Sequence, residues 1–445
     1  MRRVIAVLGL VFTLCTVLSA KEYRGKNGMP GKGYWQNFPS YRIDADFDNQ
    51  KNVIDGVERI AYKNNSPYKL DSIVFNLYKN TEDLSTFTIK TVKVGNNDLD
   101  YRIDKTKMIV YLKKPLKHGK TLDISVTWSF KIKKGDIRSG KYKKGYFVGY
   151  WYPQIAVFDD DGWDTVQHSG TEEFYFEYAK YDVTISTHDN FYIYATSPAI
   201  EIPNYTEKRD NVWHFNSIET YDFAFVASNS MAIDKIGRND PDGVGVDIIL
   251  ISDDESFRKN AIGSTTSFIK STSKKSAPKL KFPFEQLVLF DNGGHNGGME
   301  FPGMVNLGII RVESNAANYV VQHELGHEYA PFLAGFNQAK QAFMDEGFAS
   351  FIPYLTKELD ELRKERKYIS LCWMDWGETR GVLSDFTSYP EYPLFKESNK
   401  YTDFFDYQYI SYNKSFVAMT MLREVLGKES MDKLIHDFFE AWAYK

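Results

Sequence analysis

Two histidines and a glutamate in the run His-Glu-Leu-Gly-His are the residues best suited to do chemistry. On a helix, positions four apart lie on one face, so His323 and His327 can reach the same metal ion while Glu324 stays free to act as a base. A second acidic block, on the next segment of the chain, supplies Glu346. Two nitrogens and one carboxylate oxygen leave the fourth corner of a tetrahedral zinc site open for water. The pattern therefore predicts a hydrolytic enzyme with a catalytic zinc ion.

Other polar residues nearby compete for the metal. Glu328 directly follows His327, so on a helix it points about 100° away from the metal face. Asp345 is adjacent to Glu346 and meets the same objection, and we expect it to orient a ligand rather than to be one. His295 lies in a glycine-rich loop and is expected to be exposed.

Length and composition indicate a protein of two or three domains with large cores. The chain has 445 residues, of which 43% are hydrophobic and 16% aromatic. Its 55 Lys and Arg nearly balance its 59 Asp and Glu, giving a formal net charge of −4. Nothing in this balance points to nucleic acid as a partner.

Residues 1–20 resemble an export signal. Arg2 and Arg3 precede an apolar run, and Ser19-Ala20 offers a small-residue cleavage point. We therefore expect a cleaved signal peptide and a periplasmic or extracellular protein without a stable membrane span. Cleavage would leave Cys372 as the only cysteine, which excludes an internal disulfide and favours a buried apolar role for that side chain.

Residues 21–235 are predicted to form a β-rich, sandwich-like domain of antiparallel strands. Apolar residues alternate strictly with polar ones from Leu122 to Phe130, and Ile73, Phe75 and Leu77 are spaced in the same way. Shorter strands are expected over residues 41–47, 181–187 and 222–226. Turn-forming clusters separate these segments.

From about residue 236 the strand patterns give way to a mixture of strand and helix patterns, and residues 236–445 are predicted to form the catalytic domain. Strands are expected at 246–252 and 284–290, with a helix between them and a glycine-rich stretch at 292–300. The histidines fall on a helix from 319 to 329 with Ser314 as N-cap, and a second helix from about 338 carries Glu346. Further helices are expected at 412–426, ended by Gly427, and at 431–442.

Three motifs in this order resemble those of the M1 zinc aminopeptidases, gluzincins related to leukotriene A4 hydrolase and aminopeptidase N. The first is the pair of histidines followed, after 18 residues, by Glu346. The second is a Gly-x-Met-Glu-Asn loop, here Gly297-Gly-Met-Glu-Phe301, with Phe at the Asn position. The third is a Tyr before a Lys-Gly helix, here Tyr412-Asn-Lys-Ser415, with Ser replacing Gly.

This resemblance implies a two-part fold, an antiparallel β-sandwich-like domain followed by a thermolysin-like α/β and helical catalytic domain. It implies one zinc ion per chain, held by His323, His327 and Glu346, with Glu324 as general base. The implied substrates are peptides with a free N-terminus.

The same resemblance assigns the substrate contacts. Glu300 would bind the α-ammonium group of the substrate, and the backbone of Gly297, Gly298 and Met299 would lie along the peptide. Tyr412 would donate a hydrogen bond to the oxyanion.

Some alternatives stay open. Tyr407 and Tyr409 are rivals of Tyr412 for the oxyanion role. Family members often carry a Gln on the β domain that helps to hold the amine, and Gln154 lies near the corresponding region. The family's C-terminal helical domain is absent before Lys445, which suggests a truncated or unusually open form. A zinc endopeptidase of the same clan and a zinc-retaining but inactive peptide-binding protein are the competing functions.

Overall fold

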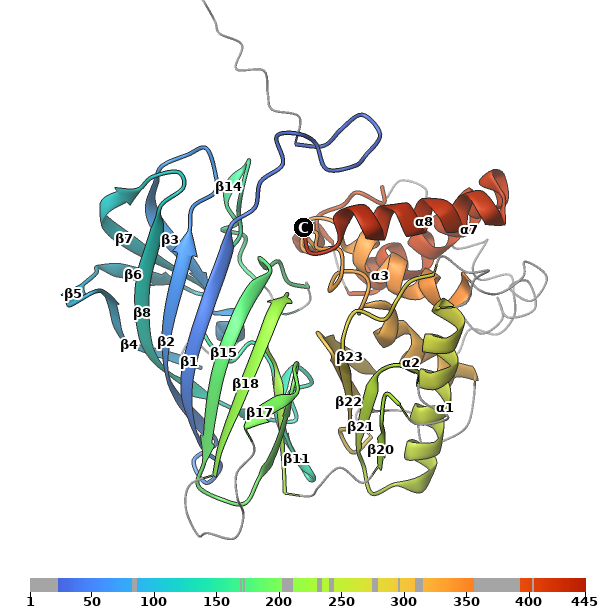
Figure 1. Cartoon of the computed structure of the whole chain (residues 1–445), viewed down its shortest axis with the longest axis horizontal. Helices are drawn as coiled ribbons and strands as arrows, with labels where there is room; N and C mark the ends of the chain where they lie inside the picture. Colours follow the sequence, from blue (N-terminus) through green and yellow to red (C-terminus); the bar gives the residue numbers. More distant parts are fainter. Residues whose placement is uncertain are drawn as a thin grey trace, which may run out of the picture.

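The computed structural model has a strand-rich first lobe and a second lobe in which helices pack on a smaller sheet (Figure 1). Asp234 already belongs to the second lobe, close to the predicted domain boundary. The described residues are 23–81, 86–168, 170, 173–201, 211–229, 234–239, 244–273, 279–294, 297–308, 315–355, 393–401 and 404–445.

A long twisted sheet forms the outer layer of the first lobe (Figure 1). Strands β1 and β2 alternate buried and exposed residues along their whole length, as expected for a sheet with one face on a core. The prediction of a purely antiparallel lobe is wrong at two places. β1 pairs in parallel with β15, with Tyr41 opposite Tyr181, and in a smaller sheet Gly140 pairs in parallel with Lys133. In order across the sheet the strands are β17 (Ala199–Glu201), β18 (Asn211–Thr220), β15 (Ala179–Thr187), β1 (Phe38–Asp48), β2 (Val53–Lys63), β8 (Thr121–Lys131), β4 (Phe87–Val94) and β5 (Asn97–Asp98).

Two smaller sheets and a hairpin complete the first lobe. One sheet contains β16 (Tyr192–Ala195), β19 (Phe225–Ser228), β11 (Gly145–Val148), β10 (Ser139–Tyr142) and β9 (Lys133–Lys134). The other contains β12 (Gln154–Ile155), β3 (Leu70–Asn76), β7 (Lys107–Leu116) and β6 (Tyr101–Asp104). The hairpin pairs β13 (Phe158–Asp159) with β14 (Gly162–Trp163).

Burial in the first lobe confirms the predicted alternation in β8 but not in β3. Ile124, Val126, Trp128 and Phe130 of β8 are all buried. In β3 the consecutive residues 73–76 are all buried. The strand expected over residues 222–226 starts later, at Phe225, because the side chain of the preceding Asp222 is held by hydrogen bonds in the core.

The second lobe is built on a mixed sheet. β21, β22 and β24 run in parallel, and β20 and β23 add antiparallel edges. Part of the predicted glycine-rich loop is therefore a hairpin of β23 and β24. Across the sheet the strands are β20 (Asp234–Ile236), β21 (Asp247–Ile251), β22 (Gln286–Asp291), β24 (Met304–Leu307) and β23 (Gly298–Phe301).

Helices cover this sheet, and the four with predicted bounds all differ from them. The helix predicted at 412–426 begins at Ser415, since residues 409–414 form a π-helix, and the one predicted at 431–442 begins at Lys428. α2 ends at Gly326, although the His327 N–H still faces the His323 carbonyl at 3.4 Å. α3 begins at Ala342, because residues 337–341 form turns in which Asn337 accepts from the following amides. The helices are α1 (Glu255–Thr272), α2 (Asn315–Gly326), α3 (Ala342–Phe351), α6 (Phe404–Gln408), α7 (Ser415–Leu426) and α8 (Lys428–Trp442), with a π-helix η4 (Tyr409–Lys414) and short 3₁₀ turns η1 (Tyr78–Asn80), η2 (Ile352–Tyr354) and η3 (Ser398–Lys400).

The end of the second lobe meets the start of the described chain. Gly427, with φ of +79°, separates α7 from α8, as predicted for a glycine that ends a helix. At the far end of α8, Trp442 Nε1 donates to the Gly28 carbonyl at 3.0 Å, and Gln36 Nε2 donates to the Tyr444 carbonyl at 2.8 Å. Residues 23–36 therefore join both lobes.

Several predictions fall on positions outside the described residues: the signal peptide, Ser314, His295 and Cys372. Among the helices that are described, none has both the length and the apolar character needed to cross a bilayer.

Candidate metal centre

The side chains of His323, His327 and Glu346 meet at one place between α2 and α3. Glu346 Oε2 lies 3.2 Å from His323 Nε2 and 3.4 Å from His327 Nε2, and the two Nε2 atoms are 3.3 Å apart. Around a tetrahedral ion with bonds of about 2.0–2.1 Å, neighbouring ligand atoms are about 3.3–3.4 Å apart. The triangle therefore has the size that a zinc ion requires.

The surroundings of these atoms also fit a cation. Glu346 is 2% exposed, and its Oε2 atom forms no hydrogen bond within the described residues despite the two nearby nitrogens. A buried carboxylate without a partner is costly, and a divalent ion between the three side chains removes that cost. The residues present thus fit zinc.

Gly326 allows the two helices to come close enough for this convergence. A Cβ atom at Gly326 would lie 2.5 Å from the Ala349 carbonyl oxygen and 2.7 Å from its Cα. Only a residue without a side chain fits there. Gly326 follows His323 by three positions and Ala349 follows Glu346 by three, so this contact sets the distance between the ligands.

The ring of His327 is oriented from its far side. Asp345 Oδ1 lies 2.8 Å from His327 Nδ1, and the Ala330 carbonyl oxygen lies 3.2 Å from the same nitrogen. Two acceptors at Nδ1 favour the tautomer with its proton there, which leaves the Nε2 lone pair free for a metal. Asp345 therefore stands where a residue that orients a ligand should stand.

The ring of His323 has a weaker support of the same kind. Ser350 Oγ lies 3.3 Å from His323 Nδ1, and Tyr319 donates a hydrogen bond to that hydroxyl at 3.1 Å. Ser350 belongs to α3 and Tyr319 to α2, so the two helices hold this imidazole together.

Glu324 faces the edge strand β23 rather than the triangle. A Cβ atom at Gly298 would lie 2.3 Å from Glu324 Oε1, so this carboxylate occupies the space above the strand that a side chain would need. Oxygen atoms of Glu300 and Glu324 and a nitrogen of His327 lie within 4.8 Å of one another. The predicted base and the predicted amine ligand are thus neighbours, with Met299 and Gly298 on an edge of the sheet.

Glu328 points away from the triangle, as predicted, and holds the hairpin. Its Oε2 accepts a hydrogen bond at 3.0 Å from the amide of Gly303, at the turn between β23 and β24. His327 belongs to the triangle of candidate metal ligands, and Glu328 holds the hairpin that carries Glu300. These two adjacent residues therefore hold both parts of the site in place.

Tyr412 closes the site from the π-helix η4. Its hydroxyl donates a hydrogen bond of 2.6 Å to Glu346 Oε1, and its ring stacks on His323 with centroids 5.3 Å apart. Tyr407, one of its two rivals for the oxyanion role, packs on the side of Tyr412, with ring centroids 6.5 Å apart. The structure thus brings Tyr412 to the edge of the metal site.

Burial and the charged neighbours set the protonation of the site. Burial opposes ionisation of Glu346, but the imidazoles of His323 and His327 outweigh it and hold the pKa of Glu346 at about 2. Burial lowers the pKa of His323. An ionised carboxylate and a neutral imidazole are the forms that bind a metal ion. Burial and the nearby Glu300 raise the pKa of Glu324 well above its usual range, as suits a general base.

Comparison with known proteins agrees with this geometry. Residues 262–445, which include α2, α3, α7 and α8, match the model of the peptidase family M1 domain. This part of the chain is similar to the peptidase family M1 domain.

The curated relatives of this chain are aminopeptidases at low identity. Aminopeptidase N of Bos taurus is 22% identical over 364 residues, which are 76% of this chain and 36% of the relative. Leucine aminopeptidase 2 of Chaetomium globosum is 24% identical over 246 residues, 53% of this chain and 38% of the relative. The chain spans about a third of the length of these relatives.

Solved structures of M1 peptidases share the fold. The M1 zinc metallopeptidase of Deinococcus radiodurans has a TM-score of 0.63 at 13% identity, covering 93% of this chain and 89% of its own. A mutant of that enzyme bound to a Tyr-Ser-Ala substrate has a TM-score of 0.61 at 12% identity, with the same coverage. Both lobes of the chain therefore share the fold of one known architecture.

One predicted contact lies elsewhere, and two residues beside the site were missed. Gln154 donates to Tyr152 at 2.9 Å and to Asp222 at 2.6 Å, so its amide is used within the buried network of the first lobe. Arg138 instead forms an ion pair with Glu173, and both interact electrostatically with the Glu300 carboxylate. Nothing local in the sequence signals this pair, because its members are 35 positions apart.

Proposed function

We propose that this chain is a zinc-dependent aminopeptidase that removes the first residue of peptides with a free N-terminus. The position of Glu300 carries the proposal, since its carboxylate lies within 4.8 Å of both Glu324 and His327. Bonds of about 1.46 and 1.52 Å separate the terminal nitrogen of a peptide from its first carbonyl carbon. A carboxylate that binds this nitrogen must therefore lie within roughly 5–6 Å of the reacting carbonyl. The short distances from Glu300 to Glu324 and His327 support this role.

The roles of the other residues follow from their places. A zinc ion held by His323, His327 and Glu346 would supply Lewis-acid chemistry, polarising the peptide carbonyl and acidifying water. Glu324, buried and with a raised pKa, accepts the proton of the attacking water and passes it to the leaving amine. Tyr412 donates its hydroxyl proton at the site edge, where negative charge develops on the carbonyl oxygen.

The base assignment is tested with Glu324→Gln. The variant should retain zinc, one ion per chain by metal analysis, because Glu324 is no ligand. Hydrolysis of an aminoacyl anilide should fall by about 10²–10⁴-fold. Turnover close to that of the unmodified protein would contradict the assignment.

The amine assignment is tested with Tyr-Ser-Ala and its N-acetylated form. The unmodified protein should cleave only the free peptide, and Glu300→Gln should lower kcat/KM for it by about 10–100-fold through loss of a charge-assisted contact. Equal cleavage of the acetylated peptide would favour an endopeptidase. Stoichiometric zinc and peptide binding without any cleavage would favour an inactive binding protein.

Export is part of the same proposal. Residues 1–20 have the composition of a cleaved signal, so the N-terminus of the mature protein should be Lys21. N-terminal sequencing of the protein from its native cell tests this, and recovery of Met1 would contradict it.

A further inference from the structure

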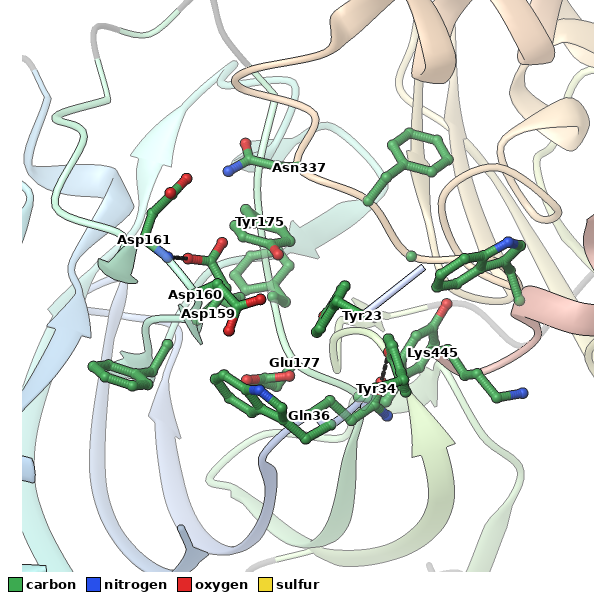
Figure 2. Close-up of a pocket in the computed structure, with 18 of the residues that line it drawn as sticks. Tyr23, Tyr34, Gln36, Asp159, Asp160, Asp161, Tyr175, Glu177, Asn337 and Lys445 are labelled. Carbon is green, nitrogen blue, oxygen red and sulfur yellow. Dashed lines mark hydrogen bonds between the residues drawn. The ribbon is translucent and has the colours of Figure 1, made fainter. Parts of the chain in front are cut away.

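A second cavity, separate from the metal centre, lies where residues 23–36 and the end of α8 meet the first lobe (Figure 2). Its volume is about 290 Å³, near the lower end of the usual range for ligand sites. None of the proposed zinc ligands, Glu324, Glu300 or Tyr412, is among the residues that line it. The side chains of the metal centre therefore do not account for the chemical character of this cavity.

The cavity contains a buried carboxylate with unused hydrogen-bonding capacity. Glu177 is 8% exposed, and its Oε1 atom has no hydrogen-bond partner within the described residues. Backbone amides of Asn37 and Phe158 face this carboxylate and favour its ionised form, but burial prevails and raises its pKa. The Glu177 carboxyl group therefore has an oxygen available to accept a hydrogen bond from a cationic ligand.

More negative charge borders Glu177. Asp159 and Asp160 line the same cavity, and Figure 2 shows their carboxylates beside Glu177 and Tyr175. Burial, with Glu177, Asp160 and Asp159 as further causes, raises the pKa of Tyr23 to about 12. The cavity thus disfavours anions and favours a positive ligand.

The cations that line the cavity are engaged elsewhere. Lys340 pairs with the exposed Asp161 at 3.1 Å, and the Lys445 ammonium donates to the Ala441 carbonyl at 2.9 Å. Arg24 lies with its guanidinium 5.1 Å from the centroid of the Trp442 ring. Each of these side chains has a contact that does not involve Glu177.

Aromatic rings form the remaining wall. Trp35, Tyr23, Tyr34 and Trp442 make a continuous series, with successive ring centroids 6.4, 4.9 and 5.6 Å apart. Aromatic faces attract cations, and planar guanidinium groups stack on them especially well. The Arg24 guanidinium over Trp442 shows that this wall already accepts such a plane.

We propose that this cavity binds a guanidinium group, which hydrogen-bonds to Glu177 and stacks on the tyrosine and tryptophan rings. A guanidinium group carries several N–H donors in a plane, so it can satisfy the free carboxylate oxygen and contact the rings at once. A compact ammonium group would satisfy the charge but would make less contact with the faces of the aromatic rings. The site does not depend on the proposed peptidase activity.

Methylguanidinium is the probe for this site, and its neutral isostere methylurea is the matched ligand control. Trp35 and Trp442 line the cavity, so intrinsic fluorescence of the full chain, titrated at constant ionic strength, reports binding. Methylguanidinium should give a saturable change and methylurea none. Similar curves for both ligands, or no saturable change, would overturn the proposal.

Variants locate the binding. Glu177→Gln should weaken methylguanidinium binding at least tenfold, because it removes the charge that faces the ligand. Asp161→Asn removes the same formal charge from an exposed rim position paired with Lys340, and binding should stay within twofold. Glu300→Gln should also leave it within twofold. Loss of binding in Glu300→Gln with retention in Glu177→Gln would place the ligand at the metal centre and overturn the proposal.

A second variant keeps the test decisive if Glu177→Gln does not fold, as judged by thermal melting. Asp159→Asn should weaken binding at least threefold, and an unchanged affinity there would contradict the site. Two sources of the guanidinium group are then compared. Binding of acetyl-Ala-Arg-Ala-amide at least tenfold tighter than methylguanidinium identifies an arginine side chain of a peptide, and equal binding identifies a free small molecule. Either result requires sensitivity to Glu177→Gln, or to Asp159→Asn where Glu177→Gln does not fold.

Discussion

Replacing Gly326 by alanine should disable the metal centre without touching a ligand. The added Cβ atom would lie 2.5 Å from the Ala349 carbonyl oxygen and 2.7 Å from the Ala349 Cα, where ordinary contacts begin at about 3.4 Å. Both atoms belong to the backbone of α3, so no side chain can move aside. The helices must separate by about 0.9 Å at this point.

That separation is large on the scale of metal coordination. Ligand distances in zinc sites tolerate changes of about 0.2 Å, and Glu346 reaches the histidines from α3 while they sit at the end of α2. Side-chain rotation can recover part of the loss, so we expect zinc affinity to fall about 10–100-fold. Overpacking should also lower the free energy of unfolding by about 1–3 kcal/mol.

The assay is zinc competition against a chromophoric chelator, together with thermal melting. Gly263→Ala is the matched control, since Gly263 is an exposed position of α1 with no atom within 4 Å of its added Cβ. That variant should gain about 0.5–1 kcal/mol of stability and bind zinc as before. A folded Gly326→Ala protein with zinc affinity within threefold of the unmodified chain would refute the reasoning.

Three further outcomes are expected. Asp345→Asn should lower zinc affinity about 10–100-fold in the same competition assay, because the acceptor at His327 Nδ1 loses its charge. Gly298→Ala should leave zinc bound but lower kcat, since its Cβ would lie 2.3 Å from Glu324 Oε1. A variant that loses zinc affinity and kcat to the same extent would contradict this. Burial raises the pKa of Asp222 from 3.8 to about 6, so the folded state binds this proton more tightly than the unfolded state. Stability should therefore fall by up to about 3 kcal/mol as pH rises from about 4 to 6, and urea unfolding of Asp222→Asn should show a smaller fall.

The parts of the molecule that follow from local spacing were predictable. His323 and His327 face one way because the helix period places positions four apart together, and β8 buries every second residue because strands alternate. These features depend only on neighbours in the chain. The convergence of Glu346 with the histidines followed from its spacing together with the family resemblance.

The parts that depend on distant neighbours were not predictable. The sequence shows a glycine at 326 but not the α3 backbone against it, and it shows Arg138 and Glu173 but not their ion pair. The parallel pairing of β1 with β15 joins strands about 140 positions apart. Gln154 was only an open candidate for the Gln that helps to hold the substrate amine, and its buried partners Tyr152 and Asp222 show where its amide is used.

The hydrogen bond from the Gly303 amide to Glu328 links the hairpin of β23 and β24 to the segment that carries His327. Because His327 and Glu328 are adjacent, any tilt of their segment carries the hairpin with Glu300 along with it. Under the proposed function, the distance between Glu300 and the metal centre should therefore change little when the two lobes move. A constant distance of this kind would restrict cleavage to the first residue of a peptide.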